Sequence, residues 1–139
     1  MDLAIYWDTS AVISVLTVDT HTSDALAWFS KDSAHLISSL TFAEASSVLS
    51  RLRREGVMTT SDANKALATL SSAPWRKVSR GPGWDQITGA AQAWNLRGAD
   101  LWHISMALTL KRQGIHELLL LTYDSQLRAA AEEARLFTY

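Results

Sequence analysis

The sequence predicts an α/β fold, a three-layer sandwich in which helices flank a central, mainly parallel sheet of four or five strands. Short apolar segments alternate with longer segments of helical periodicity, and this alternation is typical of parallel sheets. The chain has 139 residues, of which 47% are hydrophobic. Such a chain suits one domain over residues 1–139, with a core large enough to need no disulfides. Four acidic residues also lie where strands end or helices begin, which is where such folds bind ligands.

The first part of the chain is predicted to contain two strands and two helices. In order, these are a strand over 3–7, a helix that ends at 16, a helix over 22–31 and a strand over 35–38. The first strand is a short apolar run suited to burial, and Thr9 or Ser10 is expected to cap the helix that follows it.

A long helix is predicted to begin at Thr41, because Thr41-Phe-Ala-Glu44 has the spacing of a capping box. Apolar residues then recur at helical spacing, and Gly56 is expected to end the helix. This helix therefore carries Glu44 at its start and a group of arginines at its end.

The second half of the chain is predicted to be mostly helical. Helices are expected over 61–70, 84–96, 99–113 and 125–135, with an aliphatic strand over 117–122 and a closing strand over 136–139. Residues 74–83 hold both prolines and two glycines and are predicted to form a loop. The helix over 99–113 is apolar nearly all round, so it is expected in the interior.

The four acidic residues belong to separate elements but are expected to meet at one edge of the sheet. They are Asp8, Glu44, Asp100 and Asp124. Parallel strands joined by right-handed crossovers place their carboxyl ends on the same side of the molecule. Taken singly, an acid at a helix start is explained by the helix dipole. Their grouping favours a shared site instead.

Such a group of carboxylates requires a positive partner. Each close pair would repel by roughly 4 kcal/mol at an effective dielectric constant of 20. The chain has no cysteine, and its four histidines show no spacing that suggests zinc. Hard oxygen ligands favour Mg²⁺ or Mn²⁺, which complete their coordination with water and substrate phosphate.

The charge of the chain is unevenly distributed, although its net charge is only −1. Residues 1–50 carry one lysine and six acids, whereas residues 51–80 carry seven basic and two acidic residues. A basic segment beside an acidic site suits an enzyme that acts on nucleic acid, so Arg51, Arg53 and Arg54 are candidates for substrate binding. The alternative is a solvated helix face, because no stacking aromatic residues lie between them.

The expected location is the cytoplasm. Met1 is followed at once by an acid and a strand-like run, which leaves no room for a secretory signal. No apolar stretch approaches the roughly 20 residues that cross a bilayer. We therefore expect a soluble protein with no membrane partner.

Four short motifs in this chain resemble those of the PIN-domain ribonucleases. They are Asp8-Thr-Ser-Ala, Phe42-Ala-Glu44, Gly98-Ala-Asp100-Leu-Trp-His103 and Thr122-Tyr-Asp124. Their order, their spacing and the chain length look most like the VapC toxins of prokaryotic toxin–antitoxin pairs, and the resemblance covers essentially the whole chain.

The resemblance implies roles for particular residues. Asp8, Asp100 and Asp124 would bind the metal, and Glu44 would complete the catalytic acids. Ser10 and Thr122 would support them by hydrogen bonds. His103 lies one turn after Asp100 and is expected to be a buried, hydrogen-bonded histidine rather than a ligand.

The implied function is that of a Mg²⁺- or Mn²⁺-dependent ribonuclease, in which a metal-activated water hydrolyses RNA phosphodiester bonds. It would act as a toxin that inhibits growth or translation, form a homodimer, and be blocked by a cognate antitoxin protein. Two alternatives stay open: a housekeeping RNA-processing nuclease without an antitoxin, and a PIN fold used only for binding. A haloacid dehalogenase phosphatase would need a second Asp where the chain has Ser10, and no glycine-rich phosphate loop is present.

Overall fold

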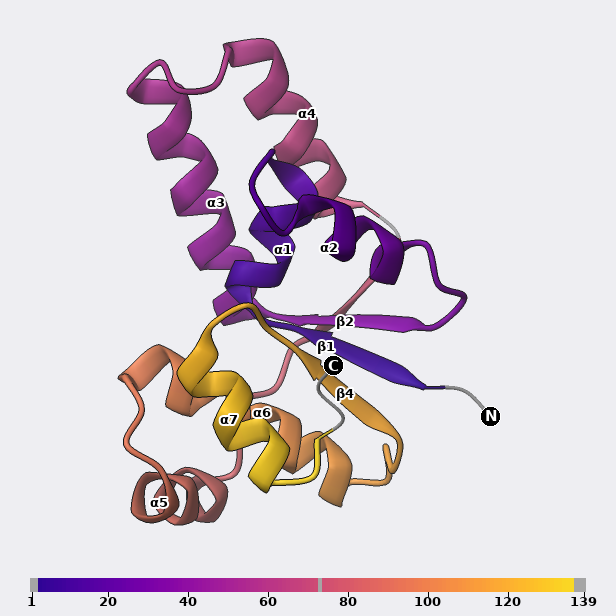
Figure 1. Cartoon of the computed structure of the whole chain (residues 1–139), viewed down its shortest axis with the longest axis vertical. Helices are drawn as coiled ribbons and strands as arrows, with labels where there is room; N and C mark the ends of the chain where they lie inside the picture. Colours follow the sequence, from indigo (N-terminus) through magenta and orange to yellow (C-terminus); the bar gives the residue numbers. More distant parts are fainter. Residues whose placement is uncertain (1–2, 73, 137–139) are drawn as a thin grey trace.

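A parallel sheet of four strands forms the centre of the protein (Figure 1). The structure is a computed structural model that describes residues 3–72 and 74–136. The strands are β1 (Ala4–Trp7), β2 (Ala34–Ser38), β3 (Trp75–Val78) and β4 (Leu118–Leu121), in the order β3-β2-β1-β4. All three pairings are parallel, with Ala4 opposite both Ala34 and Leu118. The predicted α/β fold class is therefore confirmed, and the sheet has the smaller of the two expected sizes among the described residues.

Seven helices in the described residues form the two outer layers. They are α1 (Thr9–Leu16), α2 (Thr22–Phe29), α3 (Ser39–Arg54), α4 (Thr60–Ser71), α5 (Trp84–Ala93), α6 (Gly98–Arg112) and α7 (Ser125–Glu133). Helices α1 to α4 cover one face of the sheet, and α5 to α7 cover the other (Figure 1). None of the helices in the described part of the chain is long and apolar enough to cross a membrane.

The period of two along each strand divides the core into two clusters. On β1, Ala4 and Tyr6 pack with α5, α6 and α7, whereas Ile5 and Trp7 pack with α1 to α4. Strands β1 and β4 are buried along their whole length. This explains why they read as unbroken apolar runs rather than as alternating ones.

Two predicted helix caps were wrong. Asp8, not Thr9 or Ser10, caps α1, because its Oδ1 accepts a hydrogen bond from the Ala11 amide at 2.9 Å. Ser38, not Thr41, caps α3 and accepts a hydrogen bond from the Thr41 amide at 3.1 Å. The helix therefore starts earlier than predicted.

The predicted capping box is consequently absent from α3. The Thr41 hydroxyl is buried and donates to the Trp7 carbonyl across the sheet. Glu44 lies in the second turn of the helix, where it cannot cap the first amides. Its position is explained instead by its partners in the acidic site.

The predicted loop over 74–83 was also wrong in part, because it contains the edge strand β3. Trp75 is buried against Trp7 and Phe29, while the next two residues of the strand are exposed. A four-residue edge strand with Arg76 and Lys77 at its centre shows no apolar run, and Pro and Gly flank it. In the predicted closing strand over 136–139, Leu136 is buried in irregular structure, and 137–139 lie outside the described residues.

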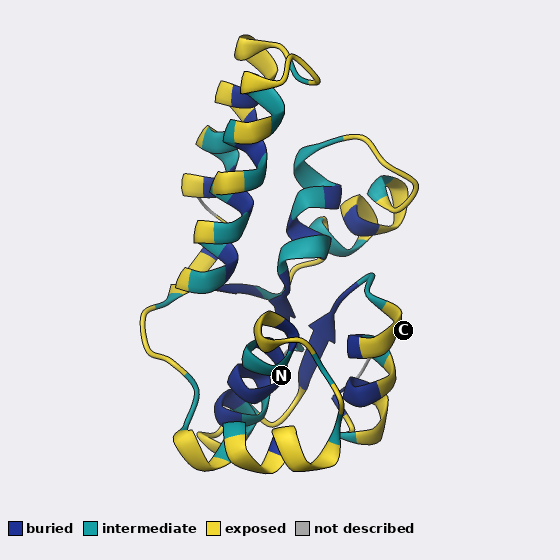
Figure 2. Ribbon diagram, turned by 90° about the vertical axis from the view of Figure 1, so that its left-hand side faces the viewer, coloured by how far each residue is buried: buried dark blue, intermediate teal, exposed yellow. Residues whose placement is uncertain are grey.

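The α3–α4 hairpin extends away from the sheet, and its far end is exposed (Figures 1 and 2). Gly56 turns the chain between the two helices with a φ of +72°, a conformation that favours glycine. The basic end of α3 is thus placed at the far end of this hairpin, away from the sheet.

Candidate active site

Asp8 lies at the junction of β1 and α1, where the strand ends and the helix begins. Its side chain is buried, with an exposed fraction of 2% for the residue. Oδ1 accepts hydrogen bonds from the Ser10 hydroxyl at 2.7 Å and from the Ala11 amide, and Oδ2 accepts one from the Thr122 hydroxyl at 2.5 Å. Burial raises the pKa of Asp8, while the charge of His103 and these hydrogen bonds act in the opposite direction.

The two predicted supporting residues join the β1–α1 corner to the neighbouring β4–α7 corner. Besides its bond to Asp8, Thr122 accepts a hydrogen bond from the Asp124 amide at 3.0 Å. Ser10 accepts one from the Tyr123 amide at 3.1 Å. Each hydroxyl therefore both donates to Asp8 and fixes the backbone that carries Asp124.

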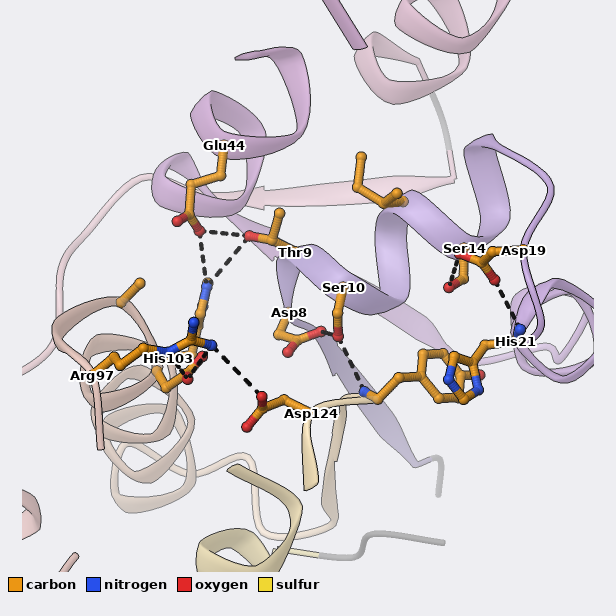
Figure 3. Close-up of a pocket in the computed structure, with 14 residues that line it drawn as sticks. Asp8, Thr9, Ser10, Ser14, Asp19, His21, Glu44, Arg97, His103 and Asp124 are labelled. Carbon is orange, nitrogen blue, oxygen red and sulfur yellow. Dashed lines mark hydrogen bonds and ion pairs between the residues drawn. The ribbon is translucent and has the colours of Figure 1, made fainter. Parts of the chain in front are cut away.

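Asp100 and Asp124 share a cationic partner, Arg97, that the sequence analysis did not identify. Figure 3 shows Arg97 beside Asp124. Asp100 lies in the first turn of α6, and Asp124 caps α7 through the Leu127 amide at 2.8 Å. The Arg97 guanidinium donates to Asp100 Oδ2 through Nε at 3.3 Å and Nη2 at 3.1 Å. Nη2 also lies 3.6 Å from Asp124 Oδ1.

Glu44 reaches the site from the second turn of α3. Its Oε1 accepts hydrogen bonds from the Thr9 hydroxyl at 2.6 Å and from His103 Nε2 at 3.3 Å. The bond from His103 is the largest cause that lowers the pKa of Glu44, and the Thr9 bond acts in the same direction. Glu44 is therefore ionised at neutral pH.

His103 belongs to a buried chain of hydrogen bonds behind Glu44. Because a carboxylate only accepts, the Nε2 that faces Glu44 carries a proton. The other ring nitrogen, Nδ1, lies 2.9 Å from the Tyr6 hydroxyl, which lies 3.0 Å from the Ser38 hydroxyl. His103 is thus a buried, hydrogen-bonded histidine, as expected from the sequence, and it supports Glu44.

All four predicted acids line one cavity of about 530 Å³, which we call the acidic cavity. Figure 3 shows Asp8, Glu44 and Asp124 around it. Its walls come from the β1–α1 junction, the α1–α2 segment, α3, the start of α6 and the β4–α7 junction. The lining residues are Asp8, Thr9, Ser10, Ile13, Ser14, Asp19, His21, Glu44, Arg97, Ala99, Asp100, His103, Tyr123 and Asp124. The four acids therefore converge at the carboxyl ends of parallel strands, as the sequence predicts.

The three candidate substrate-binding arginines do not line this cavity. Arg51, Arg53 and Arg54 lie in the last turn of α3, about 10–15 Å along the helix axis from Glu44. Arg53 donates to Asn64 of α4 at 3.2 Å. A helix C-terminus favours cations, so their position also has a structural explanation.

Arg97 and Thr9 are two side-chain partners of the acids that sequence reasoning missed. Arg97 precedes Asp100 by three residues, a spacing at which oppositely charged side chains meet on a helix. This spacing was a usable signal for the pair. No local pattern pointed to the bond between Thr9 and Glu44, because 35 residues separate them.

The donor set of the acidic cavity fits a hard divalent cation. Its four predicted carboxylates come from four separate parts of the chain, and burial disfavours the ionised form of Asp8 unless a positive charge is close. Arg97 shows that Asp100 and Asp124 are placed to share one positive group. In their present arrangement, however, no three Asp, Glu or His side chains among residues 3–72 and 74–136 are grouped so that they could hold a metal ion.

Several solved structures share this fold. A protein from Pyrobaculum aerophilum, PAE2754, is 22% identical with a TM-score of 0.64, and the match covers 94% of this chain and 86% of that one. VapC20 of Mycobacterium tuberculosis, described as a sarcin-ricin loop cleaving toxin, is 19% identical with a TM-score of 0.58, covering 91% and 95%. VapBC2 of Rickettsia felis, solved with a DNA fragment from its promoter, is 12% identical with a TM-score of 0.55, covering 96% and 93%.

The sequence itself decides the family. No curated protein matches the chain at a significant level. Residues 5–133 match the sequence profile of the PIN domain. The matched range contains all four acids and every residue of the sheet except Ala4. The predicted family is therefore confirmed: the chain belongs to the PIN domain family, whose members are generally nucleases.

Proposed function

We propose that this protein is a Mg²⁺- or Mn²⁺-dependent ribonuclease that acts as the toxin of a toxin–antitoxin pair. The observation that carries the proposal is the acidic cavity, in which a PIN-family chain brings Asp8, Glu44, Asp100 and Asp124 together from four separate elements. A purely structural role for these acids would not require them to face one cavity. The metal ligands would be Asp8, Asp100 and Asp124.

The residues of the cavity would have different roles in the reaction. A divalent cation bound here would lower the pKa of an attacking water and would offset the negative charge of the phosphate. Thr122, Ser10 and the Ala11 amide hold both oxygens of Asp8, so this ligand is oriented in advance. Glu44, kept ionised by His103 and Thr9, would add negative charge beside the cation.

RNA is the proposed substrate, and an antitoxin protein the proposed partner. VapC20, which shares the fold, is described as cleaving the sarcin-ricin loop, and VapBC2 was solved with promoter DNA. These likenesses support, for this chain, RNA cleavage, inhibition of growth or translation, and an antitoxin. We also propose that the chain forms a homodimer.

Cleavage assays test the catalytic part of the proposal. Purified protein is incubated with total RNA and Mg²⁺, Mn²⁺ or a chelator, with Asp8→Asn and Asp100→Asn as site variants. Asp85→Asn is the matched control, since Asp85 is an exposed acid in the first turn of α5 and does not line the acidic cavity. We expect metal-dependent cleavage by the wild type and the control only. Cleavage that survives chelation or both site substitutions would contradict the mechanism.

Expression in cells tests the toxin role. Induction of the wild type should arrest growth, and induction of Asp8→Asn should not. Co-expression of a small DNA-binding protein encoded beside the gene should restore growth. RNA cleavage without growth arrest would favour a housekeeping nuclease, and RNA binding without cleavage would favour a non-catalytic binding module.

A further inference from the structure

Arg97 holds an unusual place for a cation, because it stands at the N-cap position of α6. The N-terminus of a helix carries positive partial charge, so a cation there is disfavoured by the helix dipole. No side chain caps α6 by a hydrogen bond. The attraction of Asp100 and Asp124 is what offsets the unfavourable dipole and draws the guanidinium over the helix start.

The contact with Asp124 brings together two parts of the chain that are far apart in sequence. Asp100 is three residues from Arg97, whereas Asp124 belongs to the β4–α7 junction. One guanidinium therefore contacts two of the three carboxylates proposed as metal ligands. It is also the one Lys or Arg among the described residues that line the acidic cavity.

We propose that Arg97 is a resident counter-ion of the acidic cavity, which partly compensates the negative charge of Asp100 and Asp124 in the metal-free protein and is displaced when a divalent cation binds. This inference rests on the proposed metal-dependent function and adds a regulatory step to it. Asp100 and Asp124 turn from the guanidinium to the cation, and the exposed arginine side chain moves toward solvent. Arg97 thus sets the metal concentration at which the site becomes loaded.

The exposure of Arg97 determines how strong this competition is. Its side chain is 76% exposed, against 11% for Asp100 and 28% for Asp124. Exposed ion pairs are weak, so the guanidinium holds the carboxylates without excluding a divalent ion. Removal of the competitor should lower the dissociation constant for the metal by about two- to fivefold, the range that corresponds to an exposed ion pair.

Direct metal binding provides the first test. The dissociation constant for Mn²⁺ is measured on the full chain, from the electron paramagnetic resonance signal of the free ion, for wild type and Arg97→Gln. Arg112→Gln is the matched control. It removes the same charge from the last residue of the same helix, about 20 Å from Arg97 along the helix axis. We expect tighter binding for Arg97→Gln and an unchanged constant for Arg112→Gln.

Arginine side-chain NMR provides a second test, which distinguishes displacement from a simple change in the local field. The Nε–H resonance of Arg97 is assigned by its loss in Arg97→Lys, and Mg²⁺ is then titrated into the wild type. We expect this resonance to move and its solvent exchange to accelerate as the site saturates.

The outcomes separate this inference from the proposed function. Equal Mn²⁺ affinity for wild type and Arg97→Gln, or an Nε–H resonance unchanged at saturation, would overturn the counter-ion role and leave the metal-dependent nuclease standing. Absence of Mn²⁺ binding in both proteins would overturn the metal site itself, and the counter-ion role with it.

Discussion

The two halves of the acidic cavity are built on different physical principles. Around Asp8, neutral donors from Ser10, Ala11 and Thr122 hold a buried carboxylate in one orientation. Around Asp100 and Asp124, the exposed guanidinium of Arg97 compensates part of the negative charge. Hydrogen bonds from a packed interior orient a ligand, whereas an exposed ion pair compensates charge without rigid geometry.

The difference suggests a division of roles within one site. The Asp8 half is preorganised, because its donors are themselves tied to the backbone of the β4–α7 junction. The half around Asp100 and Asp124 is adjustable, because the exposed Arg97 guanidinium can be displaced. A site that binds a metal ion and a phosphate benefits from one ligand held in a fixed orientation, here Asp8, and from one positive group that can be displaced, here Arg97.

The largest effect is expected from the rigid half. Asp8→Asn should reduce the rate of RNA cleavage by about 10²- to 10³-fold, since it removes a preorganised negative charge at the centre of the cavity. Single-turnover cleavage of RNA at saturating Mg²⁺ measures this. A decrease no larger than that of Asp85→Asn would show that Asp8 is only a helix cap.

A smaller effect is expected from the donors that hold Asp8. Thr122→Val keeps the shape of the side chain but removes the hydroxyl that bonds both Asp8 and the Asp124 amide. We expect metal affinity or cleavage to fall by about 10–100-fold, as for other residues that orient metal ligands.

Thr88→Val is a suitable control for Thr122→Val, because Thr88 is exposed on α5 and its hydroxyl donates to the carbonyl of Trp84, one turn earlier in the same helix. Thr88 does not line the acidic cavity, so the activity of this variant should match the wild type. If Thr122→Val retained full Mn²⁺ affinity, the preorganisation of Asp8 would not depend on the Thr122 hydroxyl.

Asp8 and Glu44 should also respond oppositely to pH in the metal-free protein. Burial raises the pKa of Asp8 above its usual 3.8, so the folded protein binds a proton at Asp8 more tightly than the unfolded chain does. The free energy of unfolding therefore falls as pH rises through the raised pKa. The pKa of Glu44 is lowered from 4.5, so its contribution to stability is present above 4.5 and is lost as pH falls through the lowered pKa.

Urea unfolding between about pH 3 and pH 7 checks these signs. At neutral pH, Asp8→Asn should increase the free energy of unfolding, and Glu44→Gln should decrease it. Both differences should shrink in acid, where the wild-type carboxyl groups are protonated. A loss of stability in Asp8→Asn at neutral pH would mean that its hydrogen bonds outweigh the cost of burying its charge.

The smallest effect is expected from the arginines at the end of α3. Replacing Arg51, Arg53 and Arg54 together by Gln should weaken RNA binding several-fold at low salt and leave the single-turnover cleavage rate unchanged, because these residues lie outside the cavity. The slope of log affinity against log salt should become shallower by roughly one for each phosphate that the protein no longer neutralises. If the triple variant and Arg112→Gln showed the same salt dependence of RNA binding, the three arginines would be part of a solvated helix face and not of the RNA-binding surface.

Much of the fold could be predicted because its signals are local. Strands β1 and β4 are apolar runs followed closely by an acid, and α6 is apolar on most of its surface. The edge strand β3 was missed because Arg76 and Lys77 interrupt any apolar pattern, and its pairing with β2 is a long-range property.

Sequence alone was enough to predict that Asp8, Glu44, Asp100 and Asp124 meet, because apolar runs and helical spacing place them near strand ends or helix starts, and parallel strands bring those to one edge of the sheet. The way in which each acid is held became visible only in the folded structure. Glu44 proved to be a partner of His103, 59 residues away, rather than part of a capping box. Arg97 proved to be shared between Asp100 and Asp124. Hydrogen bonds and ion pairs act over a few ångströms, so their partners are chosen by packing and not by neighbouring residues in the chain.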